Sequence, residues 1–255
     1  DNDEVGEAVD GVSNSNRAVD INPEDIASLS VLKGPAATVL YGIRAANGAV
    51  IITTKKGKKN MAPVITVSSS TEITEVNKLP NLQQEYSQGR NGAFRGPSTL
   101  EGFSWGARID EDPDLQGFDS FDTFFVNGIN TDNNVSVRGG TEKISYYASA
   151  GYLNQQGIVP NSEFERYSAK TTVSADITDK LTASVSANFI NSGGVRLQRG
   201  SNLRGIMLGL VRNTPSFDIG NGKTGQAAAD DPSTYIFEDG TQRSYRNGIY
   251  DNPFW

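Results

Sequence analysis

The sequence of 255 residues contains no cysteine and no histidine. Without cysteine, the chain has neither a disulfide framework nor a thiol nucleophile. Without histidine, it lacks the commonest general base and the commonest transition-metal ligand. No stretch approaches the roughly eighteen apolar residues that a membrane-spanning helix needs. These absences remove most metal-dependent and histidine-dependent chemistry from consideration.

The charge balance and the acidic residues exclude further classes. The formal net charge of −7 argues against nucleic acid as the main partner, because binding to phosphates needs a basic surface. The acidic run from Asp110 to Asp119 is no calcium loop, because Phe121 stands where the closing glutamate belongs. Hydrolysis by two carboxylates needs no histidine, but the acidic residues lie mostly in loops without a paired arrangement. We therefore predict no enzyme, no catalytic residue, no metal and no cofactor.

The first part of the chain carries the densest local signals. Asn22 is suited to cap a helix and Pro23 to open it, which predicts a short helix over residues 23–28. The apolar residues within 29–32 predict a brief strand, which ends at the Gly-Pro pair at 34–35.

A second helix and a second strand follow at once. Pro35 opens a helical turn over residues 36–41, and Gly42 ends it as a C-terminal glycine does. The Asn-Gly pair at 47–48 predicts a tight turn, and the β-branched run 49–54 predicts a buried strand. The lysine-rich run that comes next predicts a solvated linker, so these elements form one compact αβ module.

Beyond Pro63 the pattern changes to period-two alternation, which is typical of strands with two different faces. The predicted strands are residues 64–76, 134–138, 144–153, 167–177 and 181–189. One face is polar, with serine, threonine, asparagine and lysine, and the other is small or aliphatic with aromatic residues near its ends. If the strands cross a bilayer, the apolar face should contact lipid at Tyr146, Ala169, Val173, Val185 and Ala187.

Two architectures produce such alternation: a membrane β-barrel and a soluble β-sandwich. The strands run to about ten residues, the length that a tilted strand needs to cross a bilayer. Their connections alternate between short turns, at 139–142 and 178–180, and long loops, at 77–130, around Pro160 and from Ser192 onward. Short turns on one side and long loops on the other favour the barrel. A sandwich that binds carbohydrate or acts as an adhesin stays open.

Five strands cannot close a barrel, and an open edge in lipid would leave backbone groups unpaired. We therefore expect further strands beyond Trp255. The chain opens with an acidic, glycine-bearing segment instead of a signal peptide. On this basis we expect the sequence to be an internal piece of a longer chain.

Several motifs carry a resemblance to a known family. In the first module they are Gly34-Pro35, Leu40-Tyr41-Gly42, Arg44-Ala45-Ala46-Asn47-Gly48 and Ile51 to Gly57. Further along they are Leu79-Pro80, Gln88-Gly89, Ser104-Trp105-Gly106, Asn154 to Pro160, Asn213 to Phe217 and Asp251 to Trp255. The first set resembles the end of the plug domain in TonB-dependent outer-membrane transporters, in the form found in the SusC/RagA family of Bacteroidetes. The second set resembles the first barrel strands and loops of that family.

The resemblance implies a large antiparallel up-and-down membrane β-barrel of about 22 strands with an αβ plug inside it. It places the end of the plug in residues 1–60 and the first part of the barrel in residues 61–255. It also implies active import of a large nutrient across the outer membrane, an oligosaccharide more than an oligopeptide. The implied partners are TonB, outer-membrane lipid and a SusD-like surface lipoprotein that lids the barrel. The TonB box would precede residue 1.

Two groups of residues are candidates for function. The plug motif comprises Lys33, Gly34, Pro35, Tyr41, Gly42, Arg44, Asn47 and Gly48. In it, the resemblance suggests that Lys33 and Arg44 pair with barrel carboxylates, whereas plain solvated charge is the alternative. The loop aromatics that could face substrate are Phe94, Phe103, Trp105, Tyr235 and Phe237. Aromatic faces stack on sugar rings, although packing within the loops is the alternative for most of them.

Overall fold

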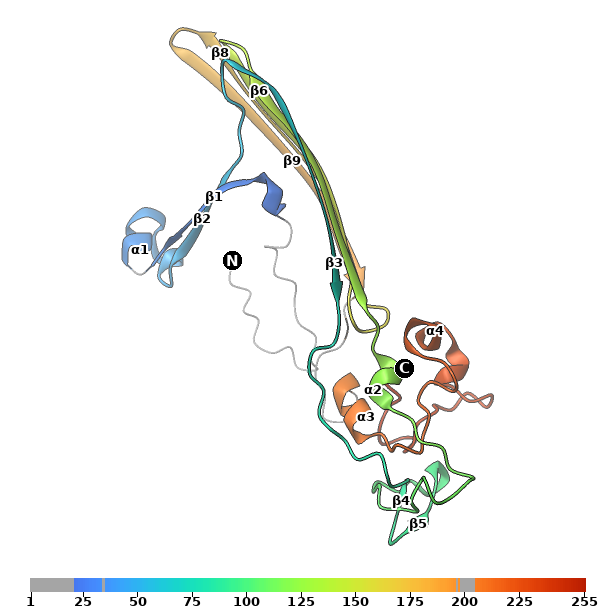
Figure 1. The fold of residues 1–255 in the computed structure, drawn as a ribbon. Helices are drawn as coiled ribbons and strands as arrows, with labels where there is room; N and C mark the ends of the chain where they lie inside the picture. Colours follow the sequence, from blue (N-terminus) through green and yellow to red (C-terminus); the bar gives the residue numbers. More distant parts are fainter. Residues whose placement is uncertain (1–20, 34, 196, 198–204) are drawn as a thin grey trace.

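The computed structural model describes residues 21–33, 35–195, 197 and 205–255. Three parts follow one another along the molecule (Figure 1). An N-terminal module, residues 21–60, lies beside a long curved sheet. A loop layer, made of residues 75–127 and 205–255, lies at the far end of that sheet.

The sheet is a meander of five long strands. They are β3 (Met61–Thr74), β6 (Gly128–Gly140), β7 (Ile144–Gln156), β8 (Glu163–Thr178) and β9 (Leu181–Val195). Their order is β3-β6-β7-β8-β9, and every neighbouring pair is antiparallel. This is the up-and-down arrangement that the alternation predicts.

Every predicted strand exists, but the boundaries differ. The largest error concerns β6, predicted over 134–138 and observed over Gly128–Gly140. Polar residues such as Asn130 and Asn133 obscure its alternation, yet both pair in register with β3 and β7. Backbone pairing to two neighbours therefore extends strands beyond their apolar pattern. The loop around Pro160 shrinks for the same reason to residues 157–162.

The register divides the sheet into two faces. One row joins Val67, Val135, Ala150, Ala169 and Phe189 across all five strands. Because side chains alternate along each strand, the neighbouring row belongs to the other face, and it carries mostly polar residues. We call these the apolar face and the polar face.

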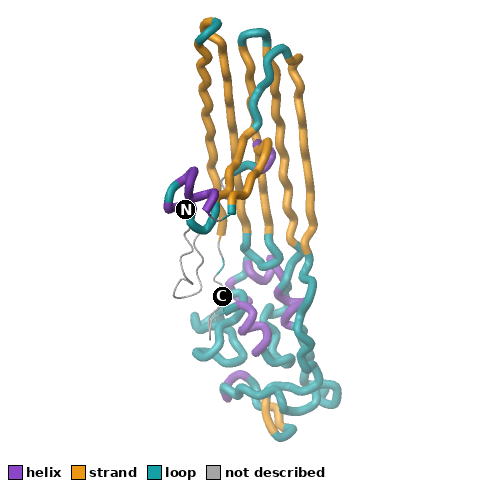
Figure 2. Tube along the Cα trace, turned by 90° about the vertical axis from the view of Figure 1, so that its left-hand side faces the viewer, coloured by secondary structure: helices purple, strands orange, loops and turns teal. Residues whose placement is uncertain are grey.

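All five residues predicted to face lipid share the apolar face. Tyr146 pairs with Val173, and Val173 pairs with Val185. Ala169 lies four residues before Val173, and Ala187 two residues after Val185, so both keep the same side. The N-terminal module lies on the concave side of the sheet in Figure 1 and in front of the sheet in Figure 2. The concave face is the polar one, because the module bonds there to Ser149 and Ser168.

The N-terminal module contains the predicted elements with one clear error. Its elements are η2 (Pro23–Asp25), β1 (Ile26–Leu32), α1 (Pro35–Tyr41), η3 (Ile43–Ala45) and β2 (Ala49–Thr54). Asn22 caps η2, as predicted, but the helix expected over 23–28 is wrong beyond Asp25. The helix ends there because the next residues, Ile26 to Leu32, form strand β1, which pairs with β2 in antiparallel orientation.

The strand predicted over 49–54 has the right bounds, but it is not buried. Val50 is 59% exposed and Ile52 36% exposed, because β1 is the only strand that pairs with β2 within the described residues. Gly42 ends α1 as predicted, with φ of +73° and its N–H donating to the Thr38 carbonyl at 2.8 Å.

The hydrophobic core lies in the loop layer, outside the sheet. The loop layer contains β4 (Gly89–Arg90), β5 (Ala93–Phe94), η4 (Pro97–Thr99), α2 (Ser120–Phe124), α3 (Ile206–Arg212), α4 (Gly225–Ala229) and η5 (Pro232–Thr234). Its buried cluster is Phe121, Phe124, Leu210, Phe217, Ile219, Ala228, Ala229, Tyr245, Tyr250 and Phe254. None of the helices in the described ranges is both long and apolar enough to cross a bilayer.

Two asparagine side chains brace the loop layer, and one of them joins its two long segments. The Asn213 amide donates to Ser120 Oγ at 2.8 Å and to the carbonyls of Thr214 and Phe217. The Asn252 amide donates to the carbonyls of Ile219 and Arg243. The two motifs that begin Asn-Thr-Pro and Asp-Asn-Pro therefore stabilise the loop layer itself.

The assignment of faces can be tested on the cysteine-free chain. Single cysteines at Tyr146, Val173 and Val185 should react about tenfold more slowly with a water-soluble maleimide than one at the loop residue Ser98, because lipid excludes the reagent. The measurement is the labelling rate in intact membranes. Equal rates at Val185 and Ser98 would contradict the assignment.

Candidate functional site

The N-terminal module is held on the polar face through a short segment, Ile21–Asp25. The Asn22 side-chain amide donates to Asn134 Oδ1 on β6 at 2.8 Å and to Ser168 Oγ on β8 at 3.1 Å. Its Oδ1 accepts from the Glu24 N–H at 3.0 Å, which is the cap of η2. Asn22 is only 4% exposed, so one side chain both shapes its own turn and bridges two strands of the sheet.

A glycine on the strand between them makes room for that amide. Gly151 on β7 pairs with Asn134 on one side and with Ser168 on the other. A Cβ at Gly151 would lie 2.3 Å from Asn134 Oδ1, 2.7 Å from Asn22 Nδ2 and 2.8 Å from Ser168 Oγ. Because Gly151 has no side chain, the Asn22 amide can occupy the space above it.

The second contact is a buried carboxylate. Asp25, 5% exposed, accepts at Oδ1 from the Tyr147 hydroxyl at 2.7 Å and from Ser149 Oγ at 2.6 Å. Tyr147 is 1% exposed and stands on the polar face, where its size breaks the small-residue pattern. This large residue on a polar strand face is therefore explained by its bond to Asp25. We call Asn134, Tyr147, Ser149, Gly151 and Ser168 the seat.

Two cations lie beside the seat on β8. Arg166, 5% exposed, donates from Nη1 to the Ile21 carbonyl at 3.4 Å. Lys170, 7% exposed, is the cross-strand partner of Ser149. The seat thus receives the Asp25 carboxylate in a region of positive charge.

The linker after β2 returns to the same sheet. The Lys55 N–H donates to the Asp25 carbonyl at 2.8 Å, and Lys55 Nζ lies 3.9 Å from a Glu24 carboxylate oxygen. Lys59 forms an ion pair with Asp176 on β8, and the Asn60 N–H donates to the Thr141 carbonyl at 3.0 Å. The prediction of a merely solvated linker is wrong for these lysines.

The predicted plug-motif residues lie away from the seat. Lys33, Tyr41, Arg44 and Asn47 are exposed, Pro35 opens α1, and Gly34 lies outside the described residues. Gly48 has φ of +108°, and a Cβ there would lie 2.8 Å from the Leu32 carbonyl oxygen. Within the described ranges, no ion pair joins Lys33 or Arg44 to the sheet. Their pairing with barrel carboxylates stays a prediction.

Sequence reasoning missed the residues that hold the module. The sequence predicts only a capping role for Asn22, and it predicts no role for Tyr147 or Asp25. The usable signal was the combination of a large tyrosine and a glycine on the polar side of one strand. Neither position suits a surface that simply faces water.

The loop aromatics divide into two groups. Phe94, Phe103 and Trp105 belong to one small unit, residues 85–108, where they are 45%, 53% and 59% exposed. Tyr235 and Phe237 lie elsewhere in the loop layer. Tyr235 is half-buried with its ring 6.0 Å from that of Trp255, so it packs within the loop layer. Phe237 is 43% exposed beside the Arg243 guanidinium.

Backbone bonds fix the exposed rings of the 85–108 unit. The Gly89 N–H donates to the Phe103 carbonyl at 2.8 Å, and the Trp105 N–H donates to the Gly89 carbonyl at 3.0 Å. Because Phe103 and Trp105 are two residues apart on an extended segment, they project from the same side. The Trp105 ring lies 5.5 Å from the ring of Tyr86, which limits its rotation.

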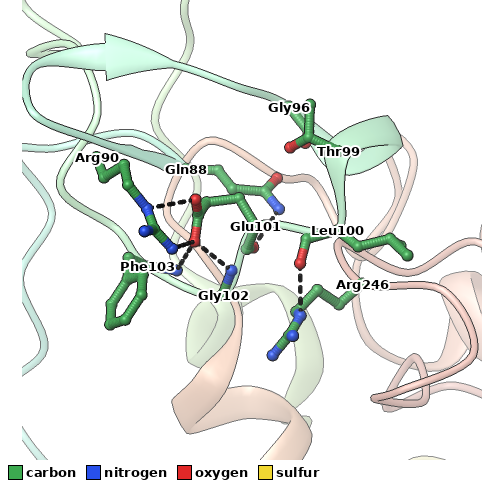
Figure 3. Close-up of polar contacts among 9 residues, drawn as sticks. All are labelled: Gln88, Arg90, Gly96, Thr99, Leu100, Glu101, Gly102, Phe103 and Arg246. Carbon is green, nitrogen blue, oxygen red and sulfur yellow. Dashed lines mark hydrogen bonds and ion pairs between the residues drawn. The ribbon is translucent and has the colours of Figure 1, made fainter.

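An ion pair braces the same unit (Figure 3). Arg90 donates from Nε and Nη2 to the two oxygens of Glu101, at 2.8 and 3.0 Å, and its guanidinium lies 4.8 Å from the Phe103 ring centre. The hydrogen bond from Arg90, supported by the N–H groups of Gly102 and Phe103, lowers the pKa of the Glu101 carboxyl, against the opposing effect of burial. Arg90 is therefore neutralised.

The acidic residues that follow Trp105 form ion pairs with Arg108. Arg108 contacts Asp110 at 2.7 Å and Glu111 at 3.0 Å, and the ion pair with Asp110 lowers the pKa of that carboxyl. The described residues contain no cluster of three acidic or other ligating side chains that could hold a metal ion.

Comparison with known proteins agrees with this geometry. Residues 1–49 match the TonB-dependent Receptor Plug Domain. The chain is 32% identical over 202 residues to the TonB-dependent receptor SusC of Bacteroides thetaiotaomicron, covering 79% of this chain and 19% of that protein. It is 30% identical over 206 residues to a TonB-dependent receptor of Formosa agariphila, with the same coverage of 79% and 19%.

A solved structure of the RagAB peptide transporter matches 94% of this chain and 30% of its own chain, with a TM-score of 0.60 and 25% identity. The chain belongs to the SusC/RagA family of TonB-dependent receptors. The five strands are accordingly part of a barrel, and the alternative of a sandwich is wrong. The chain spans about a fifth of the length of the curated relatives it matches.

The fit between Asn22 and Gly151 gives a test of the seat. Gly151→Ala should expel the Asn22 amide and lower the hydrogen-exchange protection of the Glu24 and Asp25 amides about tenfold, because buried hydrogen bonds worth about 1.4 kcal/mol are lost. The control is Gly193→Ala on β9, where an added Cβ meets nothing within 4 Å. Unchanged protection in both variants would contradict the seat.

The Glu101 ion pair predicts a pH dependence. Because its folded-state pKa is lowered, the stability that Glu101 contributes is present above the ordinary carboxyl pKa and is lost as the pH falls through the lowered value. Glu101→Gln should reduce hydrogen-exchange protection at Gly102 and Phe103 at pH 7. This difference from the native protein should shrink as the pH falls below the ordinary carboxyl pKa and through the lowered value of Glu101. Glu111→Gln is the exposed control, and a difference independent of pH would oppose the assignment.

Proposed function

We propose that the whole protein imports a large nutrient across the outer membrane, with energy delivered through TonB. In this proposal residues 1–60 are the end of the plug and residues 61–255 the first part of the barrel. The observation that carries it is the seat, where buried polar side chains hold a plug-like module on the concave, polar face of the sheet. A sheet with the opposite face apolar suits lipid outside and a polar lumen inside.

The chemistry of the contact suits a plug that must stay ordered in a lumen. Asn22 and Asp25 attach to the sheet through hydrogen bonds, and no apolar side chain of Ile26–Thr54 is needed for that attachment. A polar attachment can form beside water, since both partners can bond to water when they part. An apolar attachment to the same wall would leave apolar surface in the passage of a hydrophilic nutrient.

The proposed partners are TonB on the inner side and a SusD-like lipoprotein on the outer side. The loop layer supports the second partner, because it has its own hydrophobic core and stands at the end of the sheet that carries the long connections. A folded layer offers a partner a defined surface, whereas separate loops would have to be ordered on binding.

We propose an oligosaccharide as the nutrient. Phe103 and Trp105 offer two exposed rings on one side of a braced segment, and Arg90 beside them is neutralised by Glu101. Flat apolar faces without net charge suit the apolar faces of neutral sugar rings. An oligopeptide is the second candidate, because the matching RagAB structure is that of a peptide transporter.

Growth experiments separate the two candidates. Deleting the gene in the source bacterium should abolish growth on at least one pool of neutral oligosaccharides, because molecules of that size need active import. Growth on the constituent monosaccharides and on a tryptic peptide pool should persist. The measurement is the growth rate on each pool as sole carbon source. Loss of growth on the peptide pool alone would establish the second candidate.

The role of the rings is tested in the complemented strain. Trp105→Ala or Phe103→Ala should raise the oligosaccharide concentration for half-maximal uptake by about 2- to 10-fold, as removal of an aromatic contact does. Leu100→Ala is the matched control, since Leu100 is 43% exposed in the same unit and has no ring. Equal effects of all three variants would assign the rings to packing.

A further inference from the structure

Both ends of the arm formed by β1, α1 and β2 are fastened to the same wall. At its start, Asn22 bridges β6 and β8, and Asp25 bonds to Tyr147 and Ser149 on β7. All of these contacts are made by side chains on the polar face. The segment Ile21–Asp25 therefore crosses three adjacent strands and bonds to each of them.

At its end, the arm returns through a linker pressed against the sheet. A Cβ at Gly57 would lie 2.3 Å from the Tyr146 backbone nitrogen on β7, so only glycine allows the linker to lie so close. Lys59 pairs with Asp176 on β8, and Asn60 bonds to the turn between β6 and β7. We call the segment Ile21–Asp25 together with the linker Lys55–Asn60 the clamp.

The two halves of the clamp also hold each other. The Lys55 N–H donates to the Asp25 carbonyl, and the Lys55 ammonium faces the Glu24 carboxylate. One half therefore cannot leave the wall without breaking the contact to the other half. The two halves of the clamp therefore stabilise each other as well as binding to the wall.

The arm between the two halves is very different. Val39 is 83% exposed and Ile43 88% exposed, whereas Asn22 and Asp25 are 4% and 5% exposed. In the described part of the chain, the hydrogen bonds to the wall are thus concentrated in the clamp at the two ends of the arm.

Opposite charges also meet where the clamp contacts the wall. Asp25 brings a carboxylate to a wall that carries the buried cations Arg166 and Lys170. The attraction between the Asp25 carboxylate and these cations acts together with the hydrogen bonds of the clamp to hold this segment on the wall.

We propose that Asn22 and Asp25 are fixed anchoring residues, and that the clamp stays closed while nutrient passes. The lumen then opens by movement of other parts of the plug, and the plug does not leave the barrel as a whole. Asn22 and Asp25 act as positioning residues, since they fix where the moving parts are tethered. This inference rests on the proposed function as an importer.

The test is reversible cross-linking in the complete receptor, which has no native cysteine in this region. Cysteines replace Asn22 and Ser168, and a short bis-methanethiosulfonate joins them in whole cells. Uptake of the oligosaccharide or peptide pool that supports growth is then measured before and after treatment with a reductant. The anchored clamp predicts the same uptake rate in the two states, within about twofold.

The matched control joins Ser174 and Ser184, whose hydroxyls lie 2.7 Å apart within the sheet. Uptake lost on cross-linking 22 to 168, restored by reductant and unaffected by the control cross-link, would overturn the proposal. Absence of uptake in the native receptor would instead refute the proposed function, so the two failures are distinct.

A second measurement covers the case in which the double variant does not assemble. Ser168→Cys alone changes one atom at the seat, and Asn22 covers it. Its reaction with a water-soluble maleimide should be equally slow with and without the transported pool. Labelling that rises severalfold during uptake would show that the clamp opens, and would overturn the proposal. Val195→Cys, at an exposed position, is the reactive reference.

Discussion

The attachment of the Asp25 carboxylate to Tyr147 and Ser149 is the contact on which the rest of the structure depends. It joins the N-terminal module, which has a small hydrophobic core, to a sheet that has no hydrophobic core of its own. The sheet gains a covered polar face, and the module gains a fixed position. Without this contact, a buried tyrosine hydroxyl and a buried carboxylate would each need another partner, because a buried polar group without a hydrogen bond is destabilising.

The location of the core follows from the two faces of the sheet. A strand with one face toward lipid and one toward a lumen has no inside, so its apolar residues cannot cluster with each other. The apolar residues that do cluster, such as Phe124, Leu210 and Phe254, belong to the loop layer. Asn213 and Asn252 then fix that layer by donating to backbone carbonyls. Motifs in long loops are here the residues of a small folded unit.

Much of the fold could be predicted from the sequence, because period-two alternation and turn chemistry are local. The five strands, α1 and the Asn22 cap are examples. Strand ends such as Asn130 could not be predicted, since pairing with neighbouring strands decides them. The seat could not be predicted either, because Asn22 and Ser168 meet across 146 positions of the chain. The rings of Phe103 and Trp105 are exposed, whereas that of Tyr235 packs beside Trp255, and contact of any of them with substrate stays a prediction.

The apolar face of the sheet becomes more polar near Tyr152, at the end of the strands closest to the loop layer. Tyr152 stacks on Tyr167, and the Tyr152 hydroxyl donates to Glu165 at 3.0 Å together with the Asn154 amide at 3.1 Å. From there to the start of β7, the same face carries Ala150, Ala148, Tyr146 and Ile144. At ~3.4 Å per residue, Ile144 to Tyr152 spans ~27 Å along the strand, or ~21 Å of height at a tilt of ~40°. If the apolar face contacts lipid, the row of Tyr152 and Tyr167 lies at the level of the headgroups, and the loop layer lies beyond it in water.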